Sequence, residues 1–101
     1  MEIINSSFDL KKRISDVLIA LKNSADDKNN KIHFDFEKTI PNRLKGDPLK
    51  LSQILINLIG NSIKFTEDGN IWIKVGLLKQ FKDEVLLHFE IEDNGEGISK
   101  E

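Results

Sequence analysis

Residues 47–66 read DPLKLSQILINLIGNSIKFT, and this stretch decides the fold because it specifies one long helix. Asp47-Pro48 is a helix-start signal, since aspartate caps a first turn and proline fits the first helical position. The helix is expected to continue to about Phe65, after which turn residues close it. Its apolar side chains cover an arc of roughly 180° on a helical projection, so we expect the helix to be mostly buried. These apolar residues are Leu51, Ile54, Leu55, Leu58, Ile59, Ile63 and Phe65.

A narrow polar strip runs along the same helix. Asn57, Asn61 and Lys64 are four and three residues apart, which places them within roughly 60° of one another. Gln53 and Lys50 continue the strip toward the N-terminus. Solvated helix faces favour charged residues, whereas asparagine is a poor helix former that needs partners. The strip is therefore either a solvated face, which is the commoner case, or a surface whose amides and lysine bind Mg²⁺ and phosphate.

A second candidate site is the sequence DNGEGI at residues 93–98, directly after a predicted strand. Gly95 and Gly97 permit positive φ and close approach of the backbone to a flat ligand. A buried carboxylate at Asp93 could accept a hydrogen bond from an amino group. Asp, Asn and Gly are also the commonest turn residues, so taken alone the stretch is more simply a flexible turn.

The rest of the chain predicts an α+β fold. Apolar residues recur at helical spacing over residues 10–21, with Asp9 as the N-cap, and the polar residues 23–30 end this helix. The predicted strands are residues 31–37, 71–78 and 85–92, the last two forming an antiparallel hairpin. The order helix, strand, helix, strand, strand, loop predicts helices packed against one face of a sheet.

Composition excludes several classes of function. Fifteen basic and seventeen acidic residues are mixed along the chain and give a net charge of −2, so no nucleic-acid partner is expected. The absence of cysteine excludes disulfides, thiol catalysis and cysteine-ligated zinc. No apolar run approaches the roughly 20 residues of a membrane helix. His33 and His88 lack metal-ligand spacing and are expected to be ordinary strand residues.

The two candidate sites occur in the order found in one family. Residues 47–66 resemble the N box of sensor histidine kinases, and residues 93–98, after the hairpin, resemble the first glycine box. Phe8-Asp9-Leu10 resembles the start of the same domain. The resemblance covers residues 1–101 and implies the Bergerat ATP-binding fold of gyrase, MutL and Hsp90. In that fold the helices pack on one face of a mixed, mainly antiparallel sheet.

The resemblance implies ATP and Mg²⁺ as cofactors and gives roles to the polar strip. Asn61 would ligate the Mg²⁺ that bridges the phosphates, and Lys64 would contact the phosphates. Asn57 would lie beside the phosphates and would be the catalytic residue. Gyrase-like ATPases have a glutamate there that acts as general base on water, and asparagine cannot take that proton. Because asparagine occupies this position, the resemblance implies phosphoryl transfer to a protein histidine and not hydrolysis.

The same resemblance gives roles to the loop. Asp93 would bind the adenine amino group, while Gly95 and Gly97 would let the backbone approach the nucleotide. Ile98 completes this nucleotide-binding loop. The ATP lid, the phenylalanine box and the second glycine box of the family have no counterpart in residues 1–101. We therefore expect a partial domain that is inactive alone, binds ATP weakly, and exposes apolar surface and a sheet edge.

The implied parent protein is an ATP-dependent protein-histidine kinase of two-component signalling. It would transfer the γ-phosphate of ATP to a histidine in a separate dimerisation domain of the same protein, and its downstream partner would be a response regulator. A homodimer of the parent and its attachment to a membrane stay open, and the domain itself is expected to be cytoplasmic. A non-catalytic nucleotide-binding or protein-interaction module of the same fold is the alternative. An ATPase outside signalling is disfavoured by Asn57.

Overall fold

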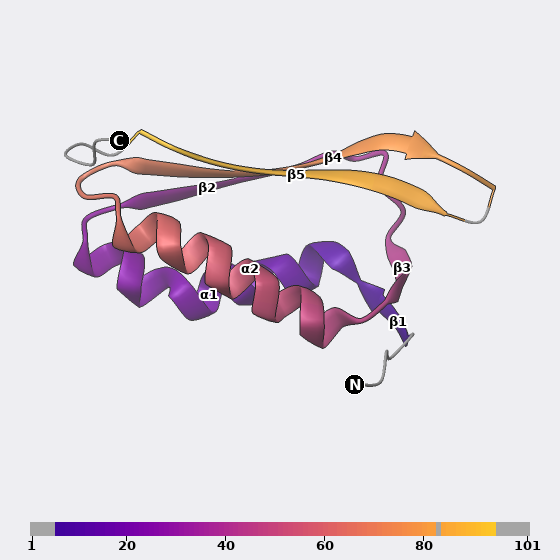
Figure 1. Ribbon diagram of the computed structural model, residues 1–101, viewed down its shortest axis with the longest axis horizontal. Coiled ribbons are helices and arrows are strands. Elements are labelled where there is room, and N and C mark those ends of the chain that lie inside the picture. Colours follow the sequence, from indigo (N-terminus) through magenta and orange to yellow (C-terminus); the bar gives the residue numbers. More distant parts are fainter. Residues whose placement is uncertain (1–5, 83, 95–101) are drawn as a thin grey trace.

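The computed structural model describes residues 6–82 and 84–94, which form two layers (Figure 1). Helices α1 (Leu10–Asp27) and α2 (Pro48–Lys64) lie side by side against one face of a three-stranded sheet. The strands of that sheet, in spatial order, are β2 (Lys31–Phe36), β4 (Asn70–Gln80) and β5 (Val85–Asp93). The expected α+β class, with helices on one face of the sheet, is confirmed.

The main sheet is mixed. β2 runs parallel to β4, with Ile32 opposite Ile71, because the connection between them crosses over through α2. β4 and β5 form the expected antiparallel hairpin, with Ile73 opposite Ile91. The ladder shifts register between Leu77 and Lys79, which is a β-bulge near the tip of the hairpin.

A second, two-stranded sheet lies beside this layer. β1 (Ser6–Asp9) pairs antiparallel with β3 (Arg43–Gly46). Sequence analysis did not predict this sheet, since four-residue strands are too short to show a clear alternation of apolar and polar residues.

Helix α1 is longer than predicted. Asp9 caps it as expected, with its carboxylate accepting from the N–H of Lys12 at 3.1 Å. The helix ends at Asp27, inside the polar stretch 23–30 that was expected to end it, but six residues beyond Leu21, the last residue of the apolar pattern. Ala25 is buried there and Lys22 forms an i,i+4 ion pair with Asp26 at 3.0 Å, so the polar side chains occupy the solvent side of a continuing helix.

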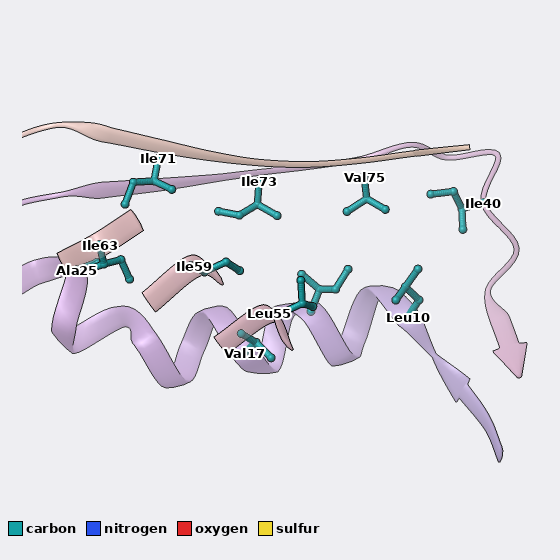
Figure 2. Close-up of a cluster of buried hydrophobic side chains, with 11 residues drawn as sticks. Leu10, Val17, Ala25, Ile40, Leu55, Ile59, Ile63, Ile71, Ile73 and Val75 are labelled. Carbon is teal, nitrogen blue, oxygen red and sulfur yellow. The ribbon is translucent and has the colours of Figure 1, made fainter. Parts of the chain in front are cut away.

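The core lies between the helices and the sheet. Figure 2 shows Ile71, Ile73 and Val75 of β4 pointing toward apolar side chains of both helices. Full burial of each such side chain stabilises the fold by about 1.5–3 kcal/mol before entropic costs. The partners on the helices are Leu10, Ile14, Val17 and Ala25 of α1, and Leu55, Ile59 and Ile63 of α2.

Helix α2 is less buried than its apolar arc predicted. Ile54 and Leu58 are each 48% exposed and Phe65 is 52% exposed. The prediction of a mostly buried helix was wrong because α2 packs along one stripe only, leaving half of the apolar arc facing outward. The expected exposed apolar surface is therefore present on the described residues. No helix in the described ranges is long and apolar enough to cross a membrane.

Candidate functional site

The outer side of α2 carries the predicted polar strip. Asn57, Asn61 and Lys64 are all exposed, and they lie on the same face of one helix. Gly60, within this segment, has no heavy atom within 4 Å of the position that a Cβ would take. The Lys64 ammonium lies 5.4 Å from the ring centroid of Phe65, within the range of a cation–π contact. The structure thus brings two amides and one ammonium together on an open surface.

Buried Asn30 holds the end of α2 in place. Its amide nitrogen donates to the carbonyl oxygens of Thr66 at 2.8 Å and Ile63 at 3.3 Å. Its amide oxygen accepts from the N–H of Gly69 at 3.1 Å. Carbonyl groups at a helix C-terminus have no partner within the helix, so these bonds satisfy groups that would otherwise be orphaned. Asn30 therefore positions the helix end that carries Lys64.

Asp93 is the last residue of β5 and lies opposite Ile71 in the ladder. Its side chain is exposed, so the expected buried carboxylate is not found. Asp93 lies at the end of the outer strand β5, and no strand in the described part of the chain pairs with the far side of β5. Gly95, Gly97 and Ile98 lie outside the described residues.

The two candidate sites approach each other at one end of the molecule. Lys64 ends α2 and Asp93 ends β5. The C-terminal ends of these two elements lie at the same end of the fold, and α2 contacts β5 (Figure 1). Spacing along the sequence predicted each site separately, whereas their proximity follows from the way α2 crosses the sheet.

Charge is distributed unevenly at this end of the fold. The pKa of Glu92, next to Asp93, is lowered by a hydrogen bond with Glu90 and by Lys74, whose ammonium lies 3.3 Å from the Glu92 carboxylate. Glu92 and Lys74 lie on the face of the sheet opposite to Asp93, because successive side chains of a strand alternate between the two faces. At the candidate site itself, a carboxylate lies at the end of β5 on Asp93 and an ammonium lies at the end of α2 on Lys64. A ligand with a basic or amino-bearing part and an anionic part would match this arrangement.

Thr66 is a further residue of this region that sequence analysis did not single out. It follows α2 directly, is 1% exposed, and its hydroxyl oxygen has no hydrogen-bond partner among the described residues. A buried hydroxyl without a partner costs about 1–3 kcal/mol unless a water or a ligand group pairs with it. Nothing in the sequence distinguished this hydroxyl from the turn residues around it.

The donor set does not resemble a resident metal centre. The described part of the chain contains no group of three or more His, Cys, Asp or Glu side chains placed to hold a metal ion. A single amide oxygen is a weak ligand alone, and Mg²⁺ normally keeps several water or phosphate ligands.

The chain is similar to known proteins in sequence and in fold. Residues 46–101 match the sequence model of the family described as histidine kinase-, DNA gyrase B- and HSP90-like ATPases. The chain is 38% identical over 91 residues to the signal transduction histidine-protein kinase BarA of Escherichia coli. The aligned region covers 90% of this chain and 10% of BarA. The chain thus spans about a tenth of the length of that relative.

Two solved structures share the fold. Histidine kinase AdeS of Acinetobacter baumannii superposes with a TM-score of 0.73 at 25% identity, covering 99% of this chain and 47% of the AdeS chain. Histidine kinase ThkA, crystallised with the response regulator protein TrrA, superposes with a TM-score of 0.65 at 27% identity. That match covers 72% of this chain and 22% of the ThkA chain.

Proposed function

This chain belongs to the histidine kinase-, DNA gyrase B- and HSP90-like ATPases, as part of the catalytic domain of a sensor histidine kinase, and from this premise we propose that its α2 face binds ATP. The observation that carries the proposal is the exposed strip of Asn57, Asn61 and Lys64 on α2. The strip ends at the C-terminal end of α2, at the same end of the fold as Asp93, the last residue of β5 (Figure 1). An exposed helix face with two asparagines one turn apart is unusual for a surface that serves only solvation.

Each side chain of the strip has a distinct task in the proposal. Lys64 neutralises phosphate charge as a point charge, and its contact with the Phe65 ring limits its freedom. Asn61 would hold Mg²⁺ through its amide oxygen, and the ion would supply positive charge beside the phosphates. Asp93 accepts a hydrogen bond from the adenine amino group.

Asn57 favours phosphoryl transfer to a histidine over hydrolysis of ATP. An amide cannot accept a proton from water as a carboxylate base does, so water bound beside the phosphates is not activated. Phosphoryl transfer depends instead on positioning and on neutralisation of charge, which the strip supplies. The γ-phosphate then goes to a histidine in a separate dimerisation domain of the parent protein. A response regulator is the downstream partner, in keeping with the ThkA complex.

We further propose that residues 1–101 form only part of the ATP-binding domain, so that the chain alone binds ATP weakly and does not autophosphorylate. The residue roles are therefore best tested in the complete kinase. Asn61→Ala and Asp93→Ala should each abolish ATP binding, measured by titration of a fluorescent ATP analogue with Mg²⁺. Asn23→Ala, which replaces an exposed asparagine of α1, should leave affinity unchanged.

The alternative, a non-catalytic nucleotide-binding or protein-interaction module of the same fold, predicts different results. A protein-interaction module requires that neither Asn61→Ala nor Asp93→Ala changes the behaviour of the complete protein toward ATP, whereas a nucleotide-binding module loses ATP affinity but transfers no phosphate to a histidine even as wild type. Unchanged affinity in both variants would overturn the site assignment. A kinase that binds ATP and hydrolyses it rapidly without a histidine acceptor would contradict the role given to Asn57.

A further inference from the structure

Strand β2 has one backbone edge without a partner strand in the described part of the chain. It pairs with β4 on its other side only. The N–H groups of Lys31 and Glu37 donate to carbonyls on the β4 side, at 2.9 and 3.0 Å. Backbone groups of a strand alternate in direction, so Ile32, Phe34 and Phe36 present their N–H and C=O groups to the open edge. The edge therefore offers a regular row of hydrogen-bonding groups.

This edge lacks the features that usually prevent strand pairing. β2 contains no proline, its pairing with β4 has no bulge, and no charged side chain points inward. Its inward residues are apolar and only half-buried. Ile32 and Phe34 border a groove of about 500 Å³ between β2 and α1, where Ile19 is 71% exposed. Polar groups for pairing and an apolar groove to receive side chains thus lie together.

We propose that a second copy of this chain adds its own β2 to this edge, antiparallel and centred on Phe34. Phe34 then faces Phe34 of the other copy, and Ile32 faces Phe36, so the groove side of the contact is apolar. On the outer face Lys31 lies opposite Glu37 and His33 lies opposite Asp35. The twofold axis repeats each of these pairs, and the two main sheets become one continuous sheet.

Charge complementarity selects this occupant and this register. A pairing centred on His33 keeps Lys31 opposite a carboxylate, that of Asp35, but places two His33 rings opposite each other and Glu37 opposite Asn29. A pairing centred on Asp35 places two carboxylates opposite each other, which creates repulsion. Glu37 stays ionised, because hydrogen bonds from Thr39 and from the N–H of Leu77 lower its pKa. The register centred on Phe34 places Lys31 opposite Glu37 in both halves of the contact.

His33 is already fixed on the outer face. Its Nε2 lies 2.9 Å from the side-chain oxygen of Asn70, and its ring stacks on Trp72 with the centroids 5.4 Å apart. Little side-chain freedom is therefore lost when a carboxylate approaches the ring. Pairing at β2 also leaves the proposed ATP face open, since β2 packs with α1 whereas α2 contacts β5. The inference is thus independent of the proposed function.

The test uses sedimentation velocity of the chain over a range of concentrations, where a reversible dimer is expected. Lys31→Glu places a carboxylate opposite Glu37 twice in the dimer, and Glu37→Lys places an ammonium opposite Lys31 twice. Each variant alone should weaken the dimer about tenfold or more, since cross-strand charge pairs contribute roughly 0.2–1 kcal/mol each and like charges oppose pairing. An equimolar mixture of the two variants should dimerise again, because each introduced charge then meets its opposite.

Lys45→Glu is the matched control, since it makes the same charge change at an exposed position of β3. It should leave the dimer unchanged, and far-UV circular dichroism should show that every variant is folded. A wild-type chain that stays monomeric at all concentrations would overturn the proposal. So would a mixture that fails to dimerise, or a dimer that Lys31→Glu leaves intact, which would place the contact elsewhere. ATP binding is not involved in any of these results.

Discussion

Asn94 and Asn70 are joined by two hydrogen bonds at the end of the hairpin. The N–H of Asn70 donates to the side-chain oxygen of Asn94 at 2.7 Å, and the N–H of Asn94 donates to the carbonyl of Asn70 at 3.1 Å. The backbone therefore leaves β5 in a fixed direction directly after Asp93. The proposed adenine-binding residue is thus held between a paired strand and a tethered neighbour.

Asn94→Ala should loosen this end of the hairpin. The variant loses the bond to the N–H of Asn70, which is worth about 1 kcal/mol, and Asp93 loses a positional constraint. Urea unfolding should show a loss of this size, and the complete kinase should bind ATP more weakly. Asn94→Asp keeps an acceptor oxygen and should retain most of both properties. Equal losses in the two variants would contradict this explanation.

Asn30→Ala should be strongly destabilising. The change leaves the Gly69 N–H and the Thr66 carbonyl without their partner in a buried region and removes one of the donors to the Ile63 carbonyl, at a cost of about 3 kcal/mol. Chemical denaturation measures the loss directly. Asn23→Ala, on the exposed side of α1, is the control and should change stability by less than about 0.5 kcal/mol. A small effect of Asn30→Ala would show that water replaces the amide without loss.

Thr66→Val should raise the stability of the fold and lower the affinity for ATP. Valine has the same shape as threonine but no hydroxyl, so the unpaired buried oxygen disappears and stability should rise by about 1 kcal/mol. ATP affinity of the complete kinase should fall if the hydroxyl pairs with a ligand group or with a water in the site. Thr66→Ser keeps the hydroxyl and should keep affinity. A stability loss in Thr66→Val would mean that the hydroxyl is already bonded.

Glu37 should make stability depend on pH in the acid range. Its pKa is lowered in the folded state by Thr39 and by the Leu77 N–H, so the ionised form favours folding. The contribution is complete above the unfolded value of roughly 4.3 and is lost as pH falls through the lower folded value. Thermal melts of Glu37→Gln should therefore lie below wild type at pH 7 and converge with it near pH 3. A constant gap would contradict the assignment.

The helix α2 and the hairpin could be predicted because their signals are local. Asp47-Pro48 marks the helix start, and Asp47 does cap the helix by accepting from the N–H of Lys50 at 3.1 Å. Alternation of apolar and polar residues likewise located β4 and β5. The exact end of α1 could not be predicted, because Asp26 and its neighbours are as polar as a loop. Only the burial of Ala25 distinguishes this last part of the helix from a loop.

The candidate site was predictable only in part. The strip on α2 depends on the helical period alone, so Asn57, Asn61 and Lys64 share a face as expected. The hydrogen bonds that hold the site in place join residues far apart in the sequence, so no local sequence pattern reveals them. Asn30, for example, is separated by 39 residues from Gly69, to which it binds, and Thr66 matters through burial that no spacing encodes.

The parallel pairing of β2 with β4 has a consequence for the order of folding. The β4–β5 hairpin closes a short loop, and such a unit forms within microseconds. β2 can join it only after a segment of roughly forty residues containing α2 has been closed, and closing a longer loop costs more entropy. β2 is therefore expected to join the sheet after the hairpin has formed. Until it docks, the backbone groups of β4 that pair with β2 have no partner strand.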